Sequence, residues 1–279
     1  MKYLGLLRLQ DQYIQIGVAL ASGIYLDIRE WWIIWWVIAT TFISCASFIV
    51  NELTDRNDTD RYSASSSHIK RSTRFDWRVV HLIFWGFSVL GFLISWSIGL
   101  LPWALAMWFW AVFYSLKPVR FKAVFGLDIA AQLAAWWLMP FLGPISLSGK
   151  LAEVWLPVII LACINWSIFF PYELADFTAD RKAKLMATHV VLGMRNSLIF
   201  GMVLGVFGTV MYFLFGIAVT MPYTIPVVIL AILVQFLYWR WLKLSSVKLQ
   251  KQSLRRAVLW VKPYTQLLVP FILIWWIKE

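Results

Sequence analysis

Long apolar segments separated by short polar ones run along the whole 279-residue chain. The segments show no alternation of period two, which indicates helices and not barrel strands, because a helix satisfies its own backbone hydrogen bonds in lipid. A bilayer core about 30 Å thick requires roughly 20 apolar residues per helix. Segments of about this length lie at residues 6–26, 31–50, 79–99, 101–116, 124–146, 154–172, 198–219, 223–242 and 258–277. The pattern therefore predicts an all-α, polytopic membrane protein, a bundle of nine transmembrane helices forming a single domain over residues 1–279.

Composition supports this assignment and excludes a water-soluble globule. The chain is 61% hydrophobic, only 14% charged and has a mean hydropathy of +0.74. Two cysteines, Cys45 and Cys163, both lie inside apolar segments without a CxxC spacing, so we expect small buried residues and not a disulfide or a metal site.

Charge fixes the expected orientation. If nine spans alternate across the membrane, the 25 basic residues fall on the side of the N-terminus, except for Arg29, Lys150 and Lys278. The positive-inside rule then places the N-terminus and the acidic loops described next on the cytoplasmic side. The net charge of +11 is explained by this topology and by anionic lipid headgroups, so no nucleic acid partner is expected.

Half of the 14 acidic residues fall in two short stretches, one after the second span and one after the sixth. These acids are Glu52, Asp55, Asp58, Asp60, Glu173, Asp176 and Asp180. If both helices continue past their apolar segments, Asn51 and Asp55 share one helical face, and so do Asp176 and Asp180. Two such faces would supply the oxygen ligands that Mg²⁺ prefers, and a cation would relieve the repulsion between paired carboxylates. The alternative is a set of solvated loop or cap residues.

Basic and polar residues accompany these acids. The segment FYSLKPVRFK, residues 113–122, leaves the fourth span on the same side and offers donors suited to phosphate oxygens, as does Arg8 near the inner end of the first span. The alternative for both is ordinary positive-inside charge. Asp128 and Gln132 lie one turn apart inside the fifth span, where an acid is costly and is expected to face a cavity.

Taken together, these motifs resemble those of the UbiA superfamily of intramembrane prenyltransferases. The family pattern N-D-x-x-D-x-x-x-D after the second helix is matched from Asn51 to Asp55, with Glu in the second place. Its last Asp would fall at Thr59, which Asp58 and Asp60 flank. The second pattern, D-x-x-x-D, is met by Asp176 and Asp180 with the tail DRKAKLMATHVVLG. The element Y-x-x-K is met by Tyr114 and Lys117, the opening LLRLQDQYIQIG carries Arg8, and nine helices are what the family has.

The resemblance implies that Mg²⁺ at the acidic motifs holds the diphosphate of a polyprenyl donor while its allylic C–O bond ionises, and that a lipophilic acceptor captures the carbocation. The implied metal ligands are Asn51, Glu52, Asp55, Asp58, Glu173, Asp176 and Asp180. The expected substrate-binding residues are Arg8, Tyr114, Lys117, Arg120, Lys122, Asp128 and Gln132. Catalysis itself is assigned to Asp55, Lys117, Asp176 and Asp180. Walls for the prenyl tail are expected from aromatic residues such as Trp136, Trp137, Phe169 and Phe170.

Two other functions remain open at this point. Some members of the superfamily cyclise the prenyl chain, and the segment 61–76 lacks the Arg-Pro expected in several aromatic-acceptor branches, so the acceptor could be an aromatic, a carotenoid or another lipid. A cation-coupled transporter is the alternative from another class, because acids inside spans also mark ion pathways. The acids here cluster at the mouths of the spans, which favours the enzyme.

Overall fold

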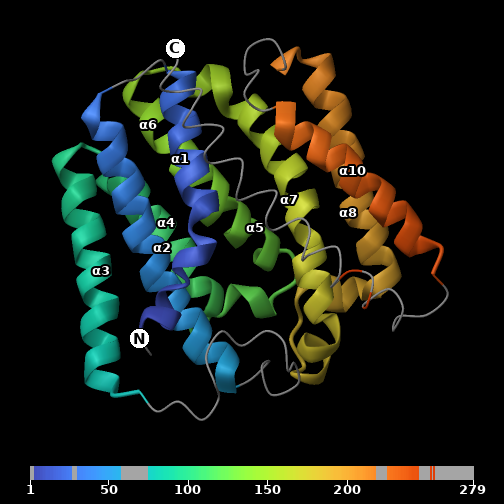
Figure 1. The fold of residues 1–279 in the computed structure, drawn as a ribbon, viewed down its shortest axis with the longest axis horizontal. Helices are drawn as coiled ribbons and strands as arrows, with labels where there is room; N and C mark the ends of the chain where they lie inside the picture. The colour runs from blue at the N-terminus through green and yellow to red at the C-terminus, as the bar shows by residue number, and fades with distance from the viewer. Residues whose placement is uncertain are drawn as a thin grey trace. The chain divides into compact units, whose positions relative to one another are not determined.

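The computed structural model describes residues 3–26, 30–57, 75–217 and 225–244, together with 252 and 254. All regular structure in these residues is helical (Figure 1). The α-helices are α1 (Tyr13–Tyr25), α2 (Trp31–Asn57), α3 (Trp77–Ser97), α4 (Leu101–Ser115), α5 (Leu127–Leu133), α6 (Met139–Leu147), α7 (Leu151–Lys182), α8 (Thr188–Leu214) and α10 (Ile225–Leu242). Six helical segments are long and apolar enough to cross a membrane, and two shorter ones are apolar. The all-α membrane fold is thus confirmed, while the predicted span 258–277 lies outside the described residues.

The chain forms two compact units, which are described separately. The first comprises Met1–Lys150 and Ala179–Ala187, and the second comprises Leu151–Thr178 and Thr188–Glu279. In the first unit α2 packs against α1, α3 and α4 (Figure 1). Gly91 of α3 permits a close approach there, because a Cβ at this position would lie 2.8 Å from Cγ1 of Ile43.

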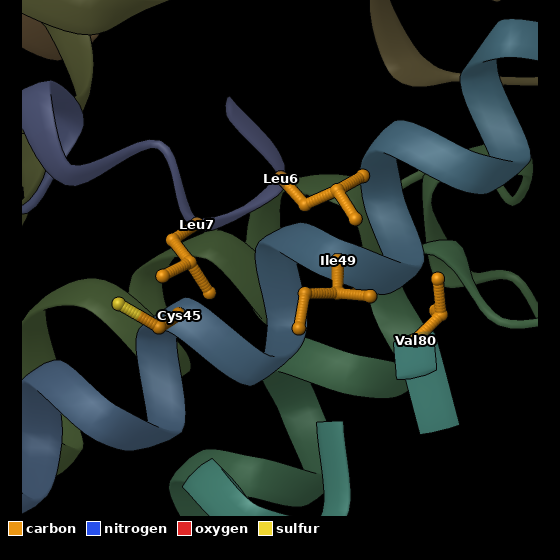
Figure 2. Close-up of a cluster of buried hydrophobic side chains, with 5 residues drawn as sticks. All are labelled: Leu6, Leu7, Cys45, Ile49 and Val80. Atoms are coloured by element: carbon orange, nitrogen blue, oxygen red, sulfur yellow. The ribbon is translucent and has the colours of Figure 1, made fainter. Parts of the chain in front are cut away.

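The predicted first span over residues 6–26 is wrong in its first part. Instead of one helix, two 3₁₀ turns (Leu4–Leu7 and Leu9–Asp11) precede α1, and Arg8 between them has left-handed backbone angles, with φ at 43°. The break lets the consecutive residues Leu6 and Leu7 both be buried, whereas a straight helix would turn consecutive side chains about 100° apart. Figure 2 shows Leu6 and Leu7 beside Cys45 and Ile49 of α2 and Val80 of α3.

The fifth span is one apolar segment, Leu127–Leu147, that contains a π-helical turn. This turn, Ala134–Leu138, precedes Pro140, and Pro144 lies inside α6. Proline has no N–H, so Pro144 leaves the carbonyl of Pro140 without its usual helical donor. The buried Trp36 of α2 supplies one, since its Nε1 donates a 2.8 Å hydrogen bond to that oxygen.

In the second unit α8 packs against α10. A Cβ at Gly201 would lie 2.6 Å from the hydroxyl of Tyr238, and one at Gly208 would lie 2.8 Å from Cγ1 of Ile164. Small residues therefore permit the close helix packing typical of membrane proteins. The helix α8 begins at Thr188, before the predicted apolar span 198–219, and bends at Gly193. Thr188 and His189 in its first turn are buried.

Candidate active site

The helix α2 continues to Asn57, well past its apolar segment. The expectation that this helix continues past its apolar segment is therefore confirmed. Asn51 and Asp55, four residues apart, lie on the same helix and share a face. The helix α7 likewise continues to Lys182, so Asp176 and Asp180 also lie four residues apart on a helix. Both acidic motifs are therefore helical ends, and the loop alternative does not hold for these four residues.

Asp55 is held by two basic residues from the segment after α4. Lys122 donates from Nζ to Oδ1 of Asp55, and Nη2 of Arg120 lies 3.6 Å from the same oxygen. Arg120 has a left-handed backbone, with φ at 43°, and both basic residues are buried. The 3₁₀ turn Phe121–Ala123, which carries Lys122, contacts α4 and α5. The predicted meeting of an acidic helix end with the cationic loop is thus present within the first unit.

Asn51 is tied to the end of α4. The hydroxyl of Ser115, which is fully buried, donates a 2.7 Å hydrogen bond to Oδ1 of Asn51. Sequence reasoning missed Ser115, and the only available signal was its place directly after Tyr114. An amide oxygen is a hard ligand suited to Mg²⁺, and the hydrogen bond from Ser115 fixes the orientation of the Asn51 side chain.

Two further predicted residues join α4 to α5. Nε2 of Gln132 donates a 2.8 Å hydrogen bond to the hydroxyl of Tyr114. Asp128, one turn earlier on α5, is only 4% exposed, as expected for an acid that does not face lipid. Lys117, by contrast, is exposed at the turn that follows α4.

Arg8 reaches the acidic end of α2 from the N-terminal segment. Its Nε donates to Oε1 of Glu52, and its Nη2 forms an ion pair with the same oxygen. The guanidinium carbon lies 5.3 Å from the ring centroid of Phe48, and that ring stacks on Trp136 at 5.3 Å. Arg8, predicted to bind diphosphate, and Glu52, predicted to bind metal, are therefore partners of each other.

The second acidic motif is divided between the two units. Asp180 is 9% exposed and belongs to the first unit, which also holds Asn51 and Asp55. Glu173 and Asp176 belong to the second unit. The predicted ligand Asp58, and Asp60 beside it, lie outside the described residues.

The donor types of the first unit fit Mg²⁺, since they are carboxylate and amide oxygens on helix ends. In the described part of the chain, no group of three or more His, Cys, Asp or Glu side chains lies close enough to hold a metal ion. Asp55 is instead neutralised by Lys122 and Arg120.

These features define an α-helical membrane protein in which the acidic end of α2 meets buried basic residues. The profile of the UbiA prenyltransferase family matches residues 14–261, so the chain belongs to this family of intramembrane prenyltransferases. Its enzymatic class and its multi-pass membrane location follow from that membership. None of the curated proteins matches the chain.

Solved structures with the same fold include UbiA homologues from Archaeoglobus fulgidus. One is bound to DMAPP and Mg²⁺ and has 19% identity and a TM-score of 0.73, over 97% of this chain and 99% of the homologue. Another is bound to GPP and Mg²⁺, with 20% identity and a TM-score of 0.73, over 97% and 100% of the two chains. A digeranylgeranylglyceryl phosphate synthase has 18% identity and a TM-score of 0.66, over 100% and 98%.

Proposed function

We propose that the protein transfers the prenyl group of a polyprenyl diphosphate to a lipophilic acceptor in the membrane. The observation that carries this proposal is the pairing of Asp55 with Lys122 and Arg120 beside Asn51, because it brings metal-type oxygens and phosphate-type cations to one place. The Archaeoglobus homologues that hold DMAPP or GPP with Mg²⁺ support the donor class and the metal. The profile match over 14–261 supports a single domain that includes both units.

In this proposal Asn51, Asp55, Asp176 and Asp180 hold Mg²⁺, with Glu173 and Asp58 as further candidates. The metal supplies positive charge that stabilises the leaving diphosphate. Lys117, Arg120, Lys122 and Arg8 bind the diphosphate oxygens, and fixed cations of this kind stabilise charge that develops during ionisation. The allylic C–O bond breaks with its electron pair on the diphosphate, the acceptor donates a pair to the allylic carbon, and the acceptor then loses a proton.

In this proposal, residues next to the diphosphate site guide the apolar prenyl chain of the donor. Trp136 stacks on Phe48 within the first unit, and Gln132 fixes the Tyr114 hydroxyl. We assign buried Asp128 and half-buried Gln132 to contact with the polar part of the substrate or acceptor. We propose the cytoplasmic side for the N-terminus and the acidic ends, on the strength of the basic residues that lie on that side in the sequence.

The test uses purified protein in lipid nanodiscs with DMAPP, GPP and longer allylic diphosphates, with an extract of membrane lipids as the acceptor. Magnesium-dependent release of diphosphate together with a prenylated lipid seen by mass spectrometry supports a transferase. A product with the mass of the bare prenyl hydrocarbon supports a terpene cyclase of the same superfamily. Turnover should be lost in Asp55→Asn and Asp176→Asn and kept in the control Glu153→Gln, an exposed acid in the first turn of α7. Full turnover in both Asp variants would contradict the assignment.

A further inference from the structure

The buried side chain of Glu52 forms an ion pair with Arg8. It is 2% exposed, and its Oε1 receives both Nε and Nη2 of the guanidinium. An arginine bound along this edge keeps its other amino group, Nη1, for a second partner. Within the described residues Nη1 makes no hydrogen bond, and the side chain of Arg8 keeps 17% of its surface exposed.

The backbone around Arg8 is built to present this side chain. A positive φ is uncommon for a residue other than glycine and persists only where its surroundings impose it. Here Leu6 and Leu7 are buried against α2 (Figure 2). Nε2 of Gln12 also donates a 3.0 Å hydrogen bond to the carbonyl of Leu7. The left-handed turn between these anchors directs the side chain of Arg8 toward Phe48 and Glu52.

The position of this pair along α2 connects it to the proposed site. Glu52 and Asp55 are three residues apart and therefore neighbours on the helix surface. Asp55 carries Lys122 and Arg120, so three basic side chains attach to adjacent turns of one helix. The pair of Arg8 with Glu52 and the pair of Lys122 with Asp55 are therefore neighbours along α2.

We propose that Glu52 is a positioning residue for Arg8 and not a metal ligand, so that Arg8 donates through Nη1 to an oxygen of the donor's diphosphate. This inference rests on the proposed function and assigns separate tasks within its acidic motif. Asn51 and Asp55 face the metal, while Glu52 fixes the direction of one diphosphate donor. The ring of Phe48 supports the guanidinium from its face, where cations are attracted to the aromatic quadrupole.

The test measures binding to the full-length protein in detergent by calorimetry, with two separate probes. The first probe is Mg²⁺ alone, and the second is inorganic pyrophosphate at saturating Mg²⁺. Glu52→Gln should leave the affinity for Mg²⁺ within about twofold, whereas its affinity for pyrophosphate should fall roughly tenfold, the usual cost of one charge-assisted hydrogen bond. Asp55→Asn should instead weaken the binding of Mg²⁺ itself.

Coupling between the two residues separates positioning from independent binding. The double variant Arg8→Ala with Glu52→Gln should bind pyrophosphate no more weakly than Arg8→Ala alone, because Glu52 acts through Arg8. In turnover, Glu52→Gln should raise the KM for the donor more than it lowers kcat. Arg8→Lys should bind pyrophosphate as weakly as Arg8→Ala, since an ammonium lacks the planar edge that Glu52 holds. Glu153→Gln is the control for loss of an acid.

Two results would overturn the inference while the proposed function stands. The first is a loss of Mg²⁺ affinity in Glu52→Gln equal to that in Asp55→Asn. The second is a double variant, Arg8→Ala with Glu52→Gln, whose loss of pyrophosphate affinity is the product of the two single losses. If Glu52→Gln fails to fold, Glu52→Asp keeps the buried charge and should show the same selective loss of pyrophosphate affinity to a smaller degree. Absence of magnesium-dependent pyrophosphate binding by the unmodified protein would contradict both proposals.

Discussion

The hydroxyl of Ser115 donates a 2.7 Å hydrogen bond to Oδ1 of Asn51, which joins the buried end of α4 to the acidic end of α2. This bond occupies one lone pair of the amide oxygen and leaves the other for a cation. It therefore fixes the direction in which a proposed metal ligand points. If Asn51 binds the metal as proposed, Ser115 would orient it, and residues that orient metal ligands usually matter nearly as much as the ligands themselves.

Removal of this hydroxyl should weaken the metal site without loss of the fold. We expect Ser115→Ala to lower the affinity for Mg²⁺ by roughly tenfold, because substitutions of such supporting residues typically cost 10–100-fold. Calorimetric titration with Mg²⁺ in the presence of pyrophosphate checks this. The control is Ser95→Ala, a buried serine on α3 whose hydroxyl bonds only the carbonyl of Gly91 in its own helix, at 2.7 Å. Equal affinities in Ser115→Ala and the control would contradict the supporting role.

Lys122 and a metal compete for the same carboxylate of Asp55. We expect Lys122→Met to bind Mg²⁺ alone about fivefold more tightly, a difference of about 1 kcal/mol, since the metal no longer competes with an ammonium for the carboxylate. The same variant should bind pyrophosphate more weakly, because the released lysine is a proposed phosphate donor. Titrations of each probe measure both effects. Lys150→Met, which removes an exposed lysine before α7, should change neither, and weaker Mg²⁺ binding in Lys122→Met would contradict the exchange.

Helical periodicity and charge were sufficient to predict the fold class and most of the spans. The same pattern predicted that Asn51 and Asp55 share a helical face, because the face follows from 3.6 residues per turn once the helix continues. It could not predict the break at Arg8, which depends on the burial of Leu6 and Leu7 against α2. Nor could it predict the partners Ser115 and Glu52, since contacts between distant residues depend on how the helices pack.

The proposed orientation can be tested with single cysteines at exposed positions on opposite ends of the helices. Lys117 follows α4 and Lys150 precedes α7, and both are exposed. In intact cells, with Cys45 and Cys163 replaced by alanine, we expect a membrane-impermeant maleimide to label Lys150→Cys. Lys117→Cys should react only after permeabilisation, because the positive-inside rule places the basic loop in the cytoplasm. The reverse labelling pattern would contradict the orientation but not the enzyme.

The bond between Trp36 and Pro140 should stabilise the first unit by satisfying a carbonyl that the helix itself cannot satisfy. Trp36→Phe removes the indole donor and leaves the oxygen of Pro140 buried without a partner, which costs about 1–3 kcal/mol, in addition to the effect of the smaller ring. We expect a lower melting temperature, measured in detergent with a thiol-reactive dye that reports exposure of buried Cys45. Trp96→Phe, at a tryptophan that is 69% exposed, is the control and should melt close to the unmodified protein.

A second substitution separates the hydrogen bond from the loss of ring volume. Pro144→Ala supplies a backbone N–H that can reach the carbonyl of Pro140, four residues earlier in α6. In the Trp36→Phe background it should therefore recover part of the lost stability, while the volume difference remains. If Pro144→Ala has the same effect in both backgrounds, the carbonyl does not need the indole, and the destabilisation comes from packing alone. Partial rescue confined to the Trp36→Phe background would show that the hydrogen bond from Trp36 of α2 to Pro140 of α6 stabilises the protein. That bond is needed because Pro144 has no N–H to donate to the same carbonyl.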